Sequence, residues 1–294
     1  MSDTTEAAAK QIRADSPTVD AVCRQLSHQV QGEPDAPLVA FAEIFFSKAP
    51  PEFIKARSPD VLAHLVRGAY DFLDTARPGQ VDVQVINPDV ANEGWYAPVT
   101  VIRTNVGERP FIVDSLREYL HSRELPIEHT IYPVLHVERE ADGRILRVRP
   151  SREGEQRESL VHCEIERVSD VELLAQIEQD IRHRLEDVVL VTDDFGAMQE
   201  ALGATEKEIS ELLPGLEDRR QELEEARAFL QWLGDDAFVF LGYRAYRLGE
   251  GQSERFVQVE PGSGLGILRR EDHSSYTEAV PFSELPKGVR ALAE

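Results

Sequence analysis

The chain of 294 residues is long enough for one large or two to three ordinary domains, and an apolar content of 41% can build hydrophobic cores. Its formal net charge of -22 repels phosphate backbones and anionic lipid surfaces, so neither nucleic acid nor membrane partners are expected. The two cysteines, Cys23 and Cys163, form neither a Cys-x-x-Cys pair nor a disulfide-rich spacing, which favours a reducing cytoplasm.

The first part of the chain is predicted to be helical after a tail. Residues 1–16 have no basic region followed by an apolar core, so they are predicted to be a disordered tail and not a signal peptide. Residues 17–80 are predicted to form a helical subdomain. Within it, Ser58 is expected to cap a helix with Pro59 at its first position, and apolar residues recur at helical spacing over Val61–Leu73.

The next part is predicted to follow a βαββαβ order, which is the layout of small ligand-sensing modules. Alternating residues predict a short strand at Val81–Val85 and a second strand at Val99–Asn105, and Pro110 opens a helix. Residues 127–137 are predicted to form one long strand. Pro133 within it favours a sheet edge or a bulge, because proline cannot donate a ladder hydrogen bond.

The module continues with a hairpin and a long helical insertion. Asp142-Gly143 indicates a hairpin turn, and Val161–Ile165 alternates with polar residues as a half-buried strand does. Residues 169–234 are predicted to be a helical insertion, with capping boxes that begin at Ser169 and at Thr205.

A last strand is expected after the insertion. The apolar run Phe238–Leu241 predicts a buried strand, so the module as a whole spans residues 81–248. Residues 249–294 are predicted to begin a further β-rich module. The helix turn at Val289–Glu294 carries no stop signal, and we expect the natural chain to continue. The predicted fold class is α+β.

No motif in the sequence indicates a catalytic or metal site. The Gly262–Gly266 run lacks the Gly-x-Gly-x-x-Gly spacing and a following helix start, so it predicts a turn between strands. The histidines show no metal-ligand spacing, and no Gly-x-Ser-x-Gly nucleophile motif is present. We therefore assign no catalytic, cofactor-binding or metal-ligating residue. A small hydrolase or metalloenzyme stays open only because carboxylates are plentiful.

One loop has the chemistry of a ligand site. It joins the end of a predicted strand to the start of a helix, where free backbone N–H groups and the positive end of the helix dipole favour a carboxylate. We predict that Asn105, Gly107, Arg109 and Pro110 bind an amino-acid or carboxylate effector. The alternative is a tight connection in which Gly107 supplies only backbone freedom.

Several segments carry a family resemblance, which extends from the helix at Pro37-Leu38 to Gly264–Gly266. The most specific segment is Arg109–Ser115, and Ile131–His136 and Phe240–Tyr243 add to it. These segments resemble the N-terminal region of the large bacterial NAD-specific glutamate dehydrogenases. The resemblance implies ACT-like modules in this region and, far downstream, a Rossmann-type domain that oxidises L-glutamate with NAD to 2-oxoglutarate and ammonium.

The resemblance implies a noncatalytic regulatory and oligomerisation region of a cytoplasmic enzyme. Its partners would be its own downstream dehydrogenase domain, further copies in a homo-oligomer and an effector, and NAD would bind only in the parent enzyme. None of the family's catalytic or dinucleotide-binding positions maps onto this chain. ACT ligand loops carry a glycine immediately after the proline, where this chain has Phe111. The alternative is a freestanding amino-acid-sensing ACT-like adaptor that is complete at Glu294.

Overall fold

The computed structural model describes residues 11–13, 15–29, 37–77, 79–250, 255–270, 276–287 and 290. The chain divides into two compact units, Met1–Glu186 and Asp187–Glu294. This division lies within the predicted helical insertion, whereas the sequence places domain boundaries after residues 80 and 248. None of the helices in the described ranges is both long and apolar enough to cross a membrane.

Four helices form the beginning of the first unit: α2 (Pro17–Gln29), α3 (Pro37–Ser47), α4 (Pro51–Lys55) and α5 (Pro59–Thr75). Helix α5 starts as predicted, because the Ser58 side chain accepts a hydrogen bond from the backbone N–H of Val61 and Pro59 occupies the first helical position. The tail prediction for residues 1–10 and 14 lies outside the described residues. Residues 11–13 and 15 are helical, and Ile12 packs against the core.

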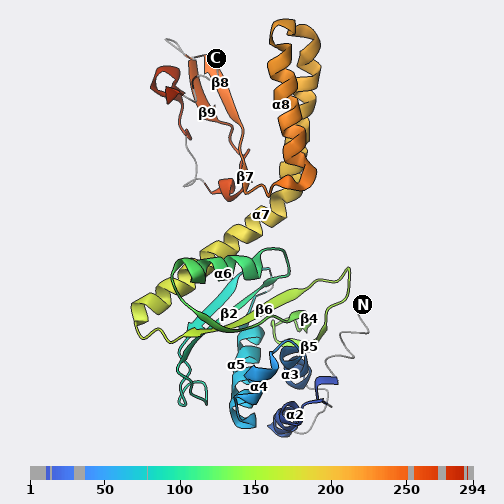
Figure 1. Cartoon of the computed structure of the whole chain (residues 1–294), viewed down its shortest axis with the longest axis vertical. Helices are drawn as coiled ribbons and strands as arrows, with labels where there is room; N and C mark the ends of the chain where they lie inside the picture. The colour runs from blue at the N-terminus through green and yellow to red at the C-terminus, as the bar shows by residue number, and fades with distance from the viewer. Residues whose placement is uncertain are drawn as a thin grey trace. The chain divides into compact units, whose positions relative to one another are not determined.

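The sheet of the first unit is antiparallel. Its strands are β1 (Asp82–Ile86), β2 (Val99–Gly107), β3 (Ile127–Ile131), β4 (Val134–Arg139), β5 (Ile145–Pro150) and β6 (Glu158–Glu166). The order is β1-β2-β6-β4-β5, and β3 also pairs with β6. Helix α6 (Ile112–Ser122) connects β2 to β3. Figure 1 shows α2 to α5 on one face of this sheet and α6 on the other.

Two strand predictions need correction. The single long strand expected over residues 127–137 is interrupted at Tyr132-Pro133, which separates β3 from β4. Strand β3 has one partner strand, β6, so it is an edge strand as Pro133 suggested. Strand β6 is not half-buried. It is buried at every residue except Glu166, because helices cover both faces of the sheet.

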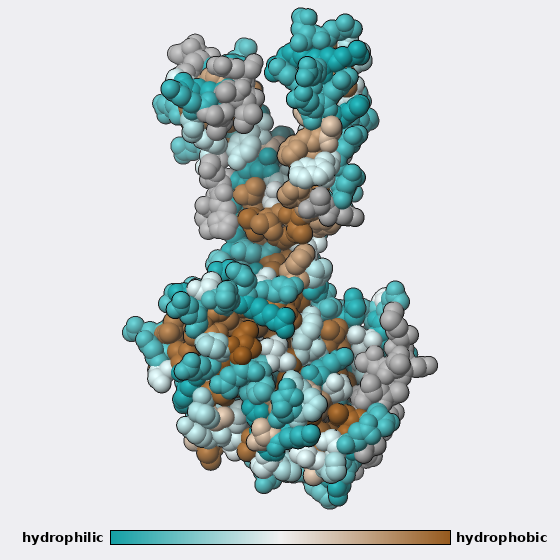
Figure 2. All heavy atoms as spheres, viewed as in Figure 1, coloured by the Kyte–Doolittle hydropathy of each residue, from teal (hydrophilic) through white to brown (hydrophobic). Residues whose placement is uncertain are grey.

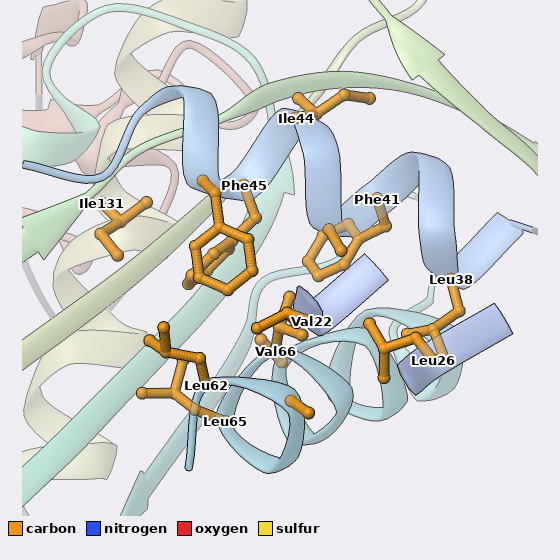
Figure 3. Packing of buried hydrophobic residues seen from close by; sticks show 14 of the residues in the cluster. Val22, Leu26, Leu38, Phe41, Ile44, Phe45, Leu62, Leu65, Val66 and Ile131 are labelled. Carbon is orange, nitrogen blue, oxygen red and sulfur yellow. The ribbon is translucent and has the colours of Figure 1, made fainter. Parts of the chain in front are cut away.

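The core of the first unit lies between the helical layer and the sheet. Figure 3 shows Phe41 and Phe45 of α3 pointing toward side chains of α5, with Ile131 of β3 beside Phe45. Phe41 and Phe45 are both 0% exposed, and their ring centroids lie 5.8 Å apart. This cluster fixes α3 and α5 against the strands that lead into the predicted effector loop.

Helix α7 (Val171–Leu212) follows the sheet in the chain and contacts the sheet border formed by β1. Arg182 donates hydrogen bonds to the carbonyl groups of Val81 (2.8 Å) and Val83 (3.0 Å). The backbone N–H of Val85 donates to the carboxylate of Glu178 at 3.3 Å. Side chains of α7 therefore satisfy backbone groups along strand β1 that no neighbouring strand reaches.

The caps of the long helical region also differ from the prediction. The side chain of Asp170, and not that of Ser169, accepts from the backbone N–H groups of Glu172 (2.9 Å) and Leu173 (3.3 Å). Thr205 does not begin a new helix. It lies inside α7, which continues to Leu212, so the second predicted capping box is wrong.

The described residues of the second unit form a helical hairpin and short strands. Helix α7 is followed by α8 (Arg220–Trp232), β7 (Gly242–Tyr243), β8 (Tyr246–Glu250), β9 (Arg255–Val259), β10 (Leu265–Gly266) and β11 (Val280–Pro281). Strand β10 pairs with β7, and β11-β9-β8 form a second small sheet. A turn lies at the start of the Gly262–Gly266 run, between β9 and β10, as expected, and the last two residues of the run form β10.

The predicted buried strand at Phe238–Leu241 is wrong. No residue of this run is in a strand, and Phe238, Val239 and Leu241 are 46%, 49% and 57% exposed. Figure 2 shows hydrophobic residues on the surface of this unit. The βαββαβ order is therefore not completed by this segment, although the α+β class is confirmed.

Candidate functional site

The predicted effector loop lines a cavity of about 330 Å³ in the first unit. Asn105, Gly107 and Arg109 contribute from the end of β2 and the following loop, and residues 155–158 contribute from the segment that enters β6. Pro110, the fourth predicted residue, is exposed and does not line the cavity. The structure thus brings three of the four predicted residues together at one hollow.

Arg109 folds back over its own loop. Its Nε donates to the carbonyl oxygen of Gly107 at 3.0 Å. A Cβ atom at Gly107 would lie 3.3 Å from an Nη atom of Arg109, so the absence of a side chain leaves room for this arrangement. Gly107 does not have a positive φ, and its role here is close approach and not backbone conformation. The fold-back orders the guanidinium beside the cavity.

The carboxylates of the cavity wall already have partners. Glu155 accepts two hydrogen bonds from Arg149, at 2.7 and 2.8 Å, which together lower the pKa of Glu155 to about 2. Glu158 accepts from Arg139 at 3.1 Å. The Tyr132 hydroxyl donates to Glu108 at 2.6 Å. Because these carboxylates already accept hydrogen bonds, they repel an anion in the cavity less than their number suggests.

The helix that follows the loop begins in an unusual way. Phe111 is the N-cap of α6 and has a φ of 72° and a ψ of 2°, the left-handed conformation that glycine adopts without strain. Its side chain is 42% exposed. Phe111 stands where ACT loops carry glycine, and its backbone still has the left-handed conformation that glycine favours. The difference at this position is therefore the added side chain.

Phe111→Gly is expected to raise the free energy of unfolding by about 0.5 to 1 kcal/mol, because it removes a side chain from a left-handed position. Chemical unfolding of the two chains measures this difference. Phe53→Gly, at a buried helical position of α4, is the contrasting variant and is expected to destabilise. A loss of stability in Phe111→Gly would show that the exposed ring makes contacts worth more than the strain.

A cluster of charged side chains is buried between the helices and the sheet. Glu164 of β6 is 0% exposed, accepts from Arg57 at 2.5 Å, and lies 3.5 Å from Nε2 of His162. Burial lowers the pKa of His162, which is also 0% exposed. These residues line neither the cavity at the effector loop nor the second cavity of this unit.

The cysteines and the possible metal ligands are poorly placed for nucleophilic or metal chemistry. Burial raises the pKa of Cys23 to about 12 and that of Cys163 to about 11, which disfavours the nucleophilic thiolate. Within the described ranges, no group of three or more His, Cys, Asp or Glu side chains is arranged to hold a metal ion.

A second cavity, of about 520 Å³, was not anticipated from the sequence. It lies in the first unit and is lined by α5, by residues 90–94 and by Arg103 of β2. Arg103 is 1% exposed. The only signal in the sequence is an arginine that follows Val101 and Ile102 within one predicted strand.

Comparisons with known proteins find a family model that matches most of the first unit. Residues 41–181 match the family model described as glutamate dehydrogenase, ACT1 domain. This region of the chain is similar to the ACT1 domain of glutamate dehydrogenases. The match contains the predicted effector loop and the strands on both sides of it.

Three curated relatives extend the similarity beyond the ACT1 region, and all three are named NAD-specific glutamate dehydrogenase. The relative from Halomonas elongata is 31% identical over 87% of this chain and 16% of its own length. Those from Pseudomonas aeruginosa and Mycobacterium tuberculosis are each 30% identical, over 78% and 54% of this chain and 14% and 10% of their own lengths. The chain thus spans about a sixth or less of these relatives, and its resemblance to an N-terminal region of such proteins is confirmed.

Proposed function

We propose that this chain is the noncatalytic regulatory and oligomerisation region of an NAD-specific glutamate dehydrogenase. The ACT1 match and the similarity to three proteins of that name support the family of the parent enzyme. The reaction that the parent would catalyse is the oxidation of L-glutamate by NAD, carried out by a domain outside this chain. We expect the purified chain neither to bind NAD tightly nor to oxidise glutamate.

The regulatory part of the proposal rests on the cavity at the effector loop. Arg109, ordered by the Gly107 carbonyl, would form a charge-assisted hydrogen bond with a carboxylate of an amino-acid or dicarboxylate effector. Asn105 lines the same cavity with a buried side chain. The observation that carries the proposal is the convergence of these three residues on one hollow.

We expect a ligand found by calorimetry among L-amino acids and dicarboxylates to bind at least about tenfold more weakly to Arg109→Ala, because one charge-assisted bond is lost. Gly107→Val should weaken binding too, since its side chain displaces the guanidinium of Arg109. Arg144→Ala is the matched control. Its arginine is paired within the β4–β5 hairpin and does not line the cavity.

Two results would count against the effector loop. One is that no ligand of the panel binds to the unaltered chain. The other is binding that both Arg109→Ala and Gly107→Val leave intact. A loss of affinity in Arg144→Ala of the same size would point to a site at the hairpin or to a general electrostatic effect.

The assembly part of the proposal rests on edge strand β3. In the described part of the sheet this strand pairs only with β6, and Ile127 at its start is 37% exposed. An unpaired edge offers backbone groups and an apolar side chain to a second copy. We infer that β3 contributes contacts between subunits of the whole protein.

Ile127→Lys is expected to weaken the homo-oligomer of the whole protein, because a charge then lies at the pairing edge. Light scattering over a range of concentrations measures the change in subunit number. Val171→Lys, at an exposed position at the start of helix α7, is the matched control. If deletion of residues 1–294 left the number of subunits unchanged, this region would have no role in assembly.

A further inference from the structure

Three aromatic rings, Phe229, Trp232 and Phe238, form an exposed aromatic cluster at the end of helix α8 in the second unit. The ring centroids of Phe229 and Trp232 lie 5.8 Å apart, and those of Trp232 and Phe238 lie 4.8 Å apart. The three side chains are 55%, 50% and 46% exposed. Single exposed apolar residues are common on protein surfaces, whereas apolar side chains that gather in one exposed patch mark interaction surfaces.

Helix α8 has no buried residue. All of its 13 residues lie within the described ranges, and each of them is exposed or partly exposed. The segment after the helix adds Val239 and Leu241, which are 49% and 57% exposed. Because most of the stability of a helix comes from burying its apolar face, a helix with an apolar end and no buried residue has the composition of a contact surface.

Carboxylates lie on the face of α8 that carries the aromatic rings. Glu222 and Glu225 precede Phe229 by seven and four residues. Trp232 follows Phe229 by three residues, so this spacing places all four side chains along one face of the helix. Glu225 is exposed and accepts a hydrogen bond from Gln221 at 3.0 Å, and no cation of the described residues pairs with it.

The charge of the helical hairpin formed by α7 and α8 indicates the kind of partner. Residues 200–232 contain nine carboxylates and four basic side chains. Three of the basic ones, Lys207, Arg219 and Arg220, lie 2.9 to 3.9 Å from carboxylates of the same hairpin. A surface of net negative charge attracts a cationic partner, and the face of a tryptophan ring attracts cations as well. A second copy of the same acidic surface would be repelled.

We propose that the aromatic cluster and Glu225 form the docking surface for a cationic, apolar segment of the parent protein that lies outside these 294 residues. The inference rests on the proposed function only in that it takes the chain to be part of such a parent. The three relatives extend far beyond the region that they share with this chain, which is at most 16% of their length. A segment of the same polypeptide has a high effective concentration at this surface, so it binds there in preference to a separate protein.

The accessibility of Trp232 tests whether the surface is covered. Hydroxyl-radical oxidation followed by peptide mass spectrometry measures the two tryptophans separately, and Trp95, which is 2% exposed in the first unit, is the internal reference. This chain is compared with the whole parent protein at an equal radical dose. We expect Trp232 to be oxidised at least about fivefold more slowly in the whole protein, because a contact surface excludes water from its centre. Trp95 should be oxidised slowly in both.

Two charge reversals in the whole protein test the chemistry of the partner. Glu225→Lys places a cation on the face that carries Phe229 and Trp232, so it should repel the docked segment and restore most of the oxidation of Trp232. Glu224→Lys is the matched control, because it makes the same change at the neighbouring residue, on another face of α8. It should leave Trp232 protected. Both glutamates are exposed, so both variants are expected to fold.

A photoreactive phenylalanine analogue in place of Phe229 identifies the segment that covers the cluster. In the purified whole protein we expect it to capture a peptide from outside residues 1–294 that contains lysine or arginine together with apolar residues. Reduction of NAD by L-glutamate is measured on the same preparation. An active dehydrogenase with an accessible Trp232 would refute the docking surface alone, and a protected Trp232 in a protein without that activity would refute the proposed function alone.

Three results would overturn the docking surface. The first is equal oxidation of Trp232 in this chain and in the whole protein. The second is capture of residues 1–294 alone, which would assign the cover to this chain or to a second copy of it. The third is an equal effect of Glu225→Lys and Glu224→Lys on the oxidation of Trp232, which would show that the partner does not carry its positive charge at this face.

Discussion

Glu164→Ala is expected to lower the free energy of unfolding of the first unit by about 3 to 5 kcal/mol, the range for removal of one partner from a buried ion pair. The Glu164 carboxylate is 0% exposed and compensates the guanidinium of Arg57, whose side chain is only 13% exposed. Without it, the arginine stays over the ring of Phe53, 3.9 Å from its centroid, with no anion beside it.

Urea unfolding followed by the fluorescence of Trp95 in a Trp232→Phe background measures this loss for the first unit. Glu166→Ala is the matched control, because Glu166 lies two residues further along the same strand and is exposed. Its effect should stay within about 0.5 kcal/mol. Equal effects of the two variants would show that the buried pair contributes nothing beyond an exposed carboxylate.

Phe45→Ala is also expected to lower the free energy of unfolding by about 3 to 5 kcal/mol, because it removes a buried ring. Phe45 is 0% exposed, and its ring centroid lies 5.5 Å from those of Phe46 and His162. Truncation removes an aromatic ring from the layer between α3 and the sheet and leaves a void that rigid neighbours cannot fill completely.

The same unfolding assay applies, and Phe41→Leu gives a milder truncation of a neighbouring ring. Phe229→Ala is the exposed counterpart, since the side chain of Phe229 is 55% exposed and belongs to the second unit. It should leave the Trp95 transition unchanged. A loss below about 1 kcal/mol in Phe45→Ala would mean that the helical layer repacks around the missing ring.

Local signals in the sequence predicted local structure well where one residue decides it. Ser58 followed by Pro59 marked the start of α5 correctly, because a cap and a fixed φ act within one turn. The helix start predicted at Thr205 was wrong because this signal, too, acts only within one turn. Within a helix its hydroxyl donates to the carbonyl of Ala201, at 3.0 Å, so a residue typical of caps is also accommodated in the interior.

Long-range burial could not be predicted from local patterns. The run Phe238–Leu241 is as apolar as a core strand, but burial depends on which surfaces meet it, and in the described residues it remains largely exposed. His162 and Glu164 gave the opposite error. Polar residues in alternation indicate a solvent face, whereas here the helical layer covers that face and Arg57 compensates the charge of Glu164.

The candidate site was predicted in part. Strand, loop and helix signals placed Asn105, Gly107 and Arg109 together, and they line one cavity. Their role in binding an effector stays a prediction. The second cavity, which Arg103 lines, could not be predicted from the sequence, because it depends on how α5 packs against β2 and on the close approach of Arg103 and Glu93 that Gly68 allows.

The side chains that α7 places along β1 prevent the sheet of another molecule from pairing with this strand. Arg182 and Glu178 already occupy backbone groups of that border, so an incoming strand would have to break these hydrogen bonds. Endless polymerisation by strand addition needs an accepting border at each end of every molecule. With β1 occupied, strand addition to this sheet is left to the border that holds β3, and two molecules that paired there would form a closed dimer.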